Sequence, residues 1–166
     1  MFIADALLGN FDRHNGNWGI LVDEQTRTVE IAPVYDCGSC LYPQLAANDM
    51  DAVLNSEDEI NKRVYTFPAS SIEENGKKIS YFDFISSLKN LDCTEALKRV
   101  SARIDMEKIK VLIDETPTLL PVQKEFYMVM ISERKAKILD YSMEQLMKFD
   151  RQEYTQDEDL GQQFTV

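Results

Sequence analysis

The chain has 166 residues, of which 44% are hydrophobic and 10% aromatic, a composition typical of one globular domain. Its formal net charge of −11 argues against direct binding to nucleic acid or to an anionic membrane surface, because both need a basic face. A nucleotide ligand stays possible, since Mg²⁺ can bridge carboxylates and phosphates. The odd number of cysteines, three, predicts free thiols in a reducing compartment, so we expect a cytoplasmic protein.

The first predicted element is a helix over residues 2–8, whose apolar residues have helical spacing and which ends at Gly9 and Asn10. It is too short to span a membrane and has no basic start, so we expect neither a transmembrane segment nor a signal peptide. Its abrupt beginning suggests that something upstream has been removed. The polar, glycine-rich segment that follows predicts a structured loop through residue 17.

Two short strands are predicted next, at residues 18–23 and 29–34, joined by a turn into a hairpin. A second polar loop begins after the hairpin. Because the two loops lie at the two open ends of one hairpin, we expect residues 12–17 to lie near Asp36. Trp18 has two open interpretations, packing under the loop or stacking near a ligand, and packing in the core is the default expectation.

The remainder is predicted to be helical, with a polar surface loop at residues 70–78. Asp92 and Asp105 are expected to start helices, Pro117 to end one, and Pro121 to begin the last and longest. The predicted helical segments are a helix or turn within 45–61, then 81–89, 94–102, 105–114 and 121–148. Residues 1–150 are expected to form one domain, followed by an acidic, disordered tail at residues 151–166.

The chemistry-bearing residues lie in the two loops. Asp12 and Asn17 are five residues apart in D-R-H-N-G-N, and Asp36 follows Asn17 by 19 residues in P-V-Y-D-C-G. Phosphoryl transfer needs a carboxylate that orients the attacking hydroxyl, and Mg²⁺ prefers oxygen ligands such as Asp and Asn. Protein kinases place a base Asp and a metal-binding Asn five residues apart, with a second Asp after a short strand. The set therefore indicates phosphoryl transfer.

The two motifs, GN-x-DRH-x-GN-W-G and APVYD-x-GS-x-L, resemble those of the HipA-like kinases over residues 9–41. The resemblance implies a mainly helical fold with a small hairpin, like the C-terminal lobe of a protein kinase. It implies that Asp12 is the catalytic Asp and that His14 braces the catalytic loop. It also implies that Asn17 and Asp36 bind Mg²⁺ and, with it, the cofactor ATP.

Arg13 has two open interpretations: it binds the cofactor by neutralising phosphate, or it pairs with a loop carboxylate. A complete kinase also needs a glycine-rich loop and a strand lysine, and the sequence contains neither. We therefore expect the N-terminal lobe to be missing and the chain to bind ATP weakly. We also expect the first helix and the hairpin strands to expose apolar surface.

The leading hypothesis is a lobe of an ATP-dependent serine/threonine protein kinase that acts on a protein substrate. HipA-like kinases often belong to toxin–antitoxin systems, so the resemblance implies a DNA-binding, antitoxin-like partner. A lipid or small-molecule kinase is one alternative, because phosphatidylinositol kinases use a related D-R-H-x-x-N loop. The other is a non-catalytic lobe that complements a separate N-terminal lobe.

Cys37 and Cys40 form a C-x-x-C motif, whose spacing is found in zinc and redox sites. A zinc site needs two more ligands, and only Cys93 and His14 remain. The motif also lacks a thioredoxin-like context, so coincidence is the favoured interpretation. The acidic residues between 49 and 59 lack the glycine and final Glu of an EF-hand, which favours a solvated face.

Overall fold

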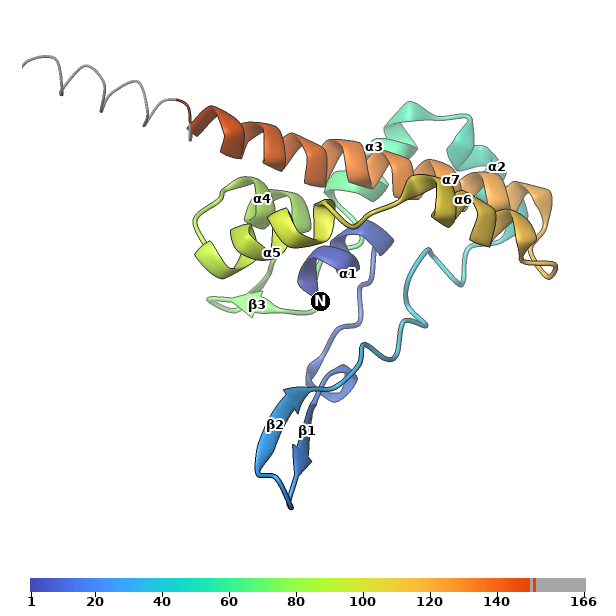
Figure 1. Ribbon diagram of the computed structural model, residues 1–166. Coiled ribbons are helices and arrows are strands. Elements are labelled where there is room, and N and C mark those ends of the chain that lie inside the picture. Colours follow the sequence, from blue (N-terminus) through green and yellow to red (C-terminus); the bar gives the residue numbers. More distant parts are fainter. Residues whose placement is uncertain (150, 152–166) are drawn as a thin grey trace, which may run out of the picture.

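The computed structural model describes residues 1–149 and 151, and it is a mainly helical body from which one hairpin projects (Figure 1). The predicted tail lies outside the described residues except for residue 151. The elements in chain order are α1 (Phe2–Leu8), the 3₁₀ turn η1 (Asn15–Asn17), β1 (Ile20–Asp23), β2 (Thr28–Ile31), α2 (Ala47–Leu54), α3 (Glu57–Tyr65), β3 (Glu73–Glu74), β4 (Lys77–Lys78), α4 (Tyr81–Ser86), α5 (Leu91–Ser101), α6 (Met106–Glu115), α7 (Pro121–Arg134) and the π-helical stretch η2 (Lys135–Asp140).

Helix α1 lies at the centre of the helical body and packs against α5, α7 and η2 (Figure 1). Ile3 and Ala6 are completely buried. The helix ends because Gly9 adopts a left-handed conformation, φ 64°, from which its amide donates to the carbonyl of Asp5. The predicted bounds are confirmed, but the expectation that this helix exposes apolar surface is wrong.

Helix α7 is the longest helix of the body, and it contacts α1, α2, α3 and α6. It begins at Pro121, as predicted, because proline at the first turn needs no amide partner. Phe126 and Met130 on this helix, and Ile138 in the stretch that continues it, are fully buried. The long helix is not uniform, because Lys135–Asp140 winds as a π-helix before residues 141–149 continue as an α-helix.

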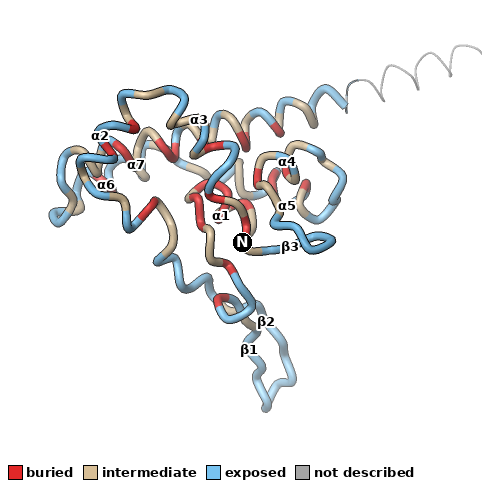
Figure 2. The backbone as a smooth tube through the Cα atoms, turned by 180° about the vertical axis from the view of Figure 1, so that it is seen from behind, coloured by how far each residue is buried: buried red, intermediate tan, exposed pale blue. Residues whose placement is uncertain are grey.

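The hairpin projects away from the helices, and both of its strands are exposed along their whole length (Figure 2). Ile20 pairs opposite Ile31 in an antiparallel register. These two side chains are 58% and 78% exposed, so the predicted apolar surface is confirmed for the hairpin. Trp18 is 46% exposed, and its predicted place in the core is wrong because the hairpin begins outside the helical body.

Three further expectations differ in detail from the structure. The predicted segment 45–61 contains two helices, α2 and α3, and the predicted loop 70–78 contains the small β3–β4 hairpin. Helix α5 is capped by Asn90 rather than by Asp92, because the Asn90 side chain accepts from the amide of Cys93. The cap of α6 by Asp105 is confirmed.

Candidate active site

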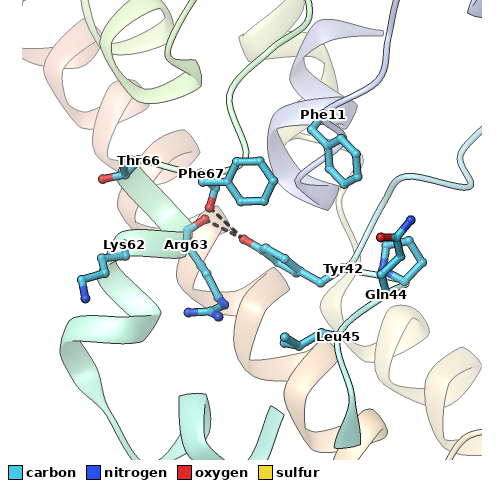
Figure 3. Close-up of a pocket in the computed structure, with 9 residues that line it drawn as sticks. Phe11, Tyr42, Gln44, Leu45, Lys62, Arg63, Thr66 and Phe67 are labelled. Carbon is cyan, nitrogen blue, oxygen red and sulfur yellow. Dashed lines mark hydrogen bonds between the residues drawn. The ribbon is translucent and has the colours of Figure 1, made fainter. Parts of the chain in front are cut away.

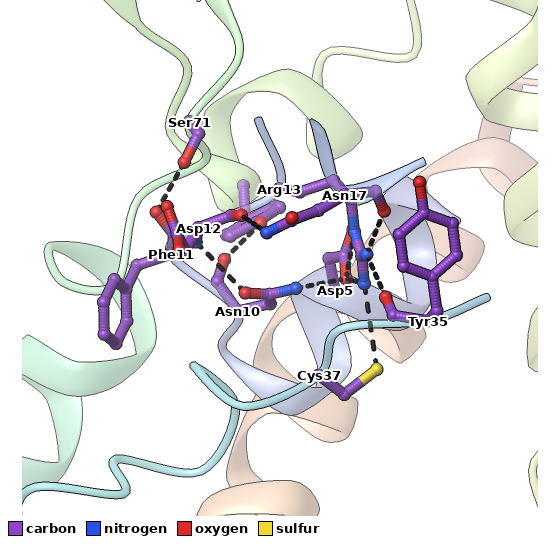
Figure 4. A network of polar contacts seen from close by, with 10 residues as sticks. Asp5, Asn10, Phe11, Asp12, Arg13, Asn17, Tyr35, Cys37 and Ser71 are labelled. Carbon is purple, nitrogen blue, oxygen red and sulfur yellow. Dashed lines mark hydrogen bonds and ion pairs between the residues drawn. The ribbon is translucent and has the colours of Figure 1, made fainter. Parts of the chain in front are cut away.

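A buried ion pair between Asp5 and Arg13 lies beneath the loop that carries Asp12 (Figure 4). Asp5 on α1 and Arg13 in the following loop are 3% and 4% exposed. Arg13 donates through Nε and Nη2 to the two carboxylate oxygens of Asp5, at 3.0 and 2.9 Å. Asn10 adds a third donor to the same carboxylate, at 2.9 Å. The hydrogen bond with Asp5 raises the pKa of Arg13, so the guanidinium is always charged.

The other side of the Arg13 guanidinium joins the two predicted loops. Its Nη1 donates to the carbonyl oxygens of Asn17 and Tyr35, both at 2.6 Å. Tyr35 returns a hydrogen bond from its hydroxyl to the carbonyl of Gly16, at 3.1 Å. The loop before the hairpin and the segment after it are therefore held together, as the hairpin topology predicted.

The loop that carries Asp12 is fixed through its backbone. The amide of Asp12 donates to Asn10 Oδ1 at 3.0 Å, and the carbonyl of Asp12 accepts from Asn17 Nδ2 at 2.7 Å. The side chain of Asp12 is 50% exposed. This arrangement holds the main chain on both sides of Asp12 and presents its carboxylate to solvent.

His14 is exposed and makes its contacts within this loop. Its Nδ1 accepts from the amide of Gly16 at 2.9 Å, and its Nε2 lies 4.0 Å from Asp12 Oδ1. His14 therefore caps the start of the short turn η1, which contains Asn17, and this position is consistent with a role in bracing the loop. Catalytic participation of His14 itself stays a prediction.

Asp36 follows Tyr35 directly and is exposed, with φ 51° in the left-handed region. Aspartate tolerates this conformation better than most residues, and such positions concentrate at functional sites. Asn17 is buried and uses its amide nitrogen within the loop, which leaves Oδ1 as the atom suited to a cation. Two protein oxygen ligands fit Mg²⁺, which takes its other ligands from phosphates and water.

The structure favours one of the two interpretations of Arg13. Its guanidinium is buried and hydrogen-bonded to Asp5 and to backbone carbonyls, which favours ion pairing over contact with phosphate. Its carboxylate partner lies on α1 instead of in a loop. Sequence reasoning missed Asp5, Asn10 and Tyr35. The only signal was a charged residue within the apolar run of the first helix.

An apolar cavity of about 480 Å³ lies beside the Asp12 loop (Figure 3). Phe11, the residue before Asp12, lines it together with Tyr42 and Phe67. The Tyr42 hydroxyl donates to the carbonyl of Arg63 at 2.9 Å, which fixes this wall of the cavity. The cavity therefore adjoins both the Asp12 loop and the chain that follows Asp36.

Two absences concern the described residues, 1–149 and 151. In this part of the chain, no three His, Cys, Asp or Glu side chains gather as they do in a zinc centre. Within the same residues, no helix has both the length and the apolar character needed to cross a membrane.

The chain resembles known proteins in both sequence and structure. No protein-family model matches the sequence. A protein of Helicobacter pylori (strain J99) named serine/threonine-protein kinase CtkA is 52% identical over 141 residues, an alignment that covers 84% of this chain and 43% of that protein. The crystal structure of a Helicobacter pylori proinflammatory kinase CtkA matches with a TM-score of 0.86 and 48% identity, covering 90% of this chain and 55% of that chain.

The chain spans about half the length of these relatives, 43% of one and 55% of the other. Because 48–52% of the aligned residues are identical, the chain resembles these proteins in sequence as well as in fold. The chain is therefore similar, over most of its own length, to part of a serine/threonine protein kinase.

Proposed function

We propose that this chain is the catalytic-loop lobe of an ATP-dependent, HipA-like serine/threonine protein kinase. The reaction transfers the γ-phosphoryl group of Mg·ATP to a hydroxyl group of a protein substrate. The observation that carries the proposal is the pair of hydrogen bonds from the Arg13 guanidinium to the carbonyls of Asn17 and Tyr35. These bonds hold the loop of Asp12 and Asn17 against the segment that leads into Asp36. The identity of 52% to a protein named as a serine/threonine kinase supports the same reaction.

In this proposal Asp12 is the catalytic base. Its backbone is held by Asn10 and Asn17 while its carboxylate is half-exposed, so a substrate hydroxyl can approach it from solvent. The carboxylate accepts the hydroxyl proton and orients the oxygen toward the phosphorus. His14 acts through the loop, since it holds the turn between Asp12 and Asn17.

The Asn17 side-chain oxygen and the Asp36 carboxylate would hold Mg²⁺, which neutralises charge on the phosphates of ATP when bound. Arg13 does not touch the nucleotide. It fixes the distance between the two ligands by binding the carbonyl of Asn17 and that of the residue before Asp36. Both halves of the metal site thus depend on one buried guanidinium.

The exposed hairpin supports a second part of the proposal, in which an N-terminal lobe covers the apolar strands and completes the nucleotide site. Opposed isoleucines at 58% and 78% exposure form a surface that a partner lobe would bury. A cytoplasmic location and a DNA-binding, antitoxin-like partner rest on the free cysteines and on the family resemblance. A lipid kinase is the weaker candidate, because a net charge of −11 repels anionic membranes.

The test is transfer of labelled γ-phosphate to a generic acceptor protein. The chain is mixed with Mg·ATP, with or without the portion of the Helicobacter pylori kinase that it does not span. We expect phosphoserine or phosphothreonine only in the complete mixture, lost in Asp12→Asn and kept in Asp49→Asn, an exposed aspartate on α2. Transfer that survives Asp12→Asn would contradict the assignment. Stable assembly of the two parts without transfer would favour the non-catalytic lobe.

A further inference from the structure

Cys37 and Cys40 occupy the two ends of one tight, solvent-facing turn. The amide of Cys40 donates to the carbonyl of Cys37 at 3.0 Å, with Gly38 and Ser39 between them. A turn of this kind brings its end Cα atoms within about 7 Å of each other. A disulfide spans a Cα separation of about 4.4–6.8 Å. The backbone is therefore already near the geometry that a disulfide requires.

The two thiols differ in access and lie within reach of each other. Cys37 is exposed and Cys40 is half-buried, and both are free. Burial, followed by the charge of the neighbouring Cys37, raises the pKa of the Cys40 thiol to about 12. Exposure makes Cys37 the thiol that an oxidant in solution meets first. Little Cys40 thiolate is present at neutral pH, so its attack on a mixed disulfide at Cys37 is the slower step, and the short turn between the two residues is what allows that attack.

The chain on either side of this turn is anchored. Before it, the carbonyl of Tyr35 is bound by Arg13 at 2.6 Å. After it, the amide of Leu41 donates to the carbonyl of Leu8 on α1 at 2.9 Å. Any adjustment that joins the sulfurs is therefore confined to the segment between Tyr35 and Leu41, which includes Asp36. A zinc ion is a poor occupant, because the described residues offer no third ligand of the His, Cys, Asp or Glu type.

We propose that Cys37 and Cys40 are a redox-active thiol pair that closes to an intramolecular disulfide by exchange with a small disulfide such as oxidised glutathione. The Cys37 thiolate attacks one glutathione sulfur and releases one glutathione thiolate, which leaves a mixed disulfide on Cys37. The Cys40 thiolate then attacks the Cys37 sulfur and releases the second glutathione. Two protein thiols lose two electrons and two protons, and one glutathione disulfide becomes two glutathione molecules.

The position of the pair gives the disulfide a consequence at the candidate active site. Cys37 follows Asp36 in the chain, and its sulfur accepts from Arg13 Nη2 at 3.8 Å (Figure 4). Closing the disulfide draws this sulfur toward Cys40, so oxidation acts on the segment that presents Asp36. This consequence rests on the proposed function and predicts several-fold weaker binding of Mg·ATP in the oxidised chain.

The primary test needs no nucleotide. The reduced chain is equilibrated with glutathione disulfide, alkylated, and examined by intact mass and peptide mapping. We expect two of the three cysteines to become resistant to alkylation, with a Cys37–Cys40 linkage and a free Cys93. The Cys93→Ser chain should behave in the same way, while Cys40→Ser should retain one glutathione on Cys37. Two alkylatable thiols in oxidised Cys93→Ser, or a glutathione on each cysteine, would overturn the proposal.

The secondary test compares Mg·ATP titrations of the reduced and the oxidised chain. Circular dichroism of both states checks that the fold is unchanged, and wild-type peptide mapping identifies the linkage without any substitution. Equal affinity in the two states would overturn the coupling. Binding in neither state would contradict the proposed function and the coupling together, whereas the mass measurement would still decide whether the thiol pair exists.

Discussion

Replacing Arg13 with lysine is the most informative perturbation of this fold. The positive charge beside Asp5 is kept, but the planar fork is lost, and with it the ability to bind both sides of the site at once. Lysine has one nitrogen with which to replace Nε, Nη1 and Nη2 of arginine. It can satisfy Asp5 or the carbonyls of Asn17 and Tyr35, and it cannot satisfy all of them.

The size of the stability loss in Arg13→Lys follows from the two carbonyl oxygens, those of Asn17 and Tyr35, that lose their hydrogen-bond donor. An unsatisfied buried acceptor costs about 1–3 kcal/mol, so losing the donors of both carbonyls predicts a stability loss of about 2–6 kcal/mol. For a chain of this size each kcal/mol lowers the melting temperature by about 2–4 °C, which gives a fall of about 4–24 °C. Asp5→Asn should cost a similar amount, about 3–5 kcal/mol, because it leaves the Arg13 charge buried without its partner.

Thermal unfolding followed by circular dichroism measures these losses directly. Arg99→Lys is the matched control, because Arg99 is exposed on α5. Trp18 adds a local signal, since it is the only tryptophan and directly follows Asn17. We expect Arg13→Lys to unfold earlier and to change the Trp18 emission before global unfolding. A melting temperature equal to that of Arg99→Lys would refute the idea that one guanidinium holds the two loops together.

Three other predictions concern residues outside the candidate metal site. Burial raises the pKa of Tyr42 to about 12, so its contribution to stability is complete below the unfolded pKa of about 10 and is lost as pH rises through about 12. Tyr42→Phe should therefore reduce the alkaline fall in melting temperature, and an unchanged fall would contradict this. Arg134, completely buried, donates to the carbonyl of Ala6 at 2.6 Å, and Arg134→Met should cost about 2–4 kcal/mol in urea unfolding. Joint replacement of Ile20 and Ile31 by threonine should reduce self-association in light scattering without lowering the melting temperature; a clear loss of stability would show that the strands are already covered.

The elements predicted best are those whose ends carry a local signal. Helix α1 ends where Gly9 takes a positive φ, and α6 begins where the Asp105 side chain accepts from the amide of Lys108 at 3.1 Å. Both signals depend on a few neighbouring residues, so they can be read from the sequence. The π-helical stretch η2 within the long last helix has no such signal, because no side-chain cap marks where it begins.

The sequence predicted which loop residues carry the chemistry, and it did not predict the buried residues that hold those loops in place. The spacing of Asp12, Asn17 and Asp36 indicated a phosphoryl-transfer set, and their catalytic roles remain predictions. The buried pair of Asp5 and Arg13 could not be foreseen, because a sequence shows a charged residue in an apolar helix without showing its partner. Only the folded chain brings the carboxylate on α1 beneath the loop.

We propose that Asn17 and Asp36 form a site for Mg²⁺ and the phosphates of ATP. The most direct measurement is a titration of the chain with Mg·ATP, followed through Trp18 and corrected with free tryptophan. Asp36→Asn is the test variant, because asparagine also tolerates the left-handed backbone, and Asp49→Asn is the exposed control. We expect a weak, saturable, magnesium-dependent change in Trp18 emission that Asp36→Asn abolishes and Asp49→Asn retains. An identical change in the Asp36→Asn chain, or one that persists without magnesium, would contradict it.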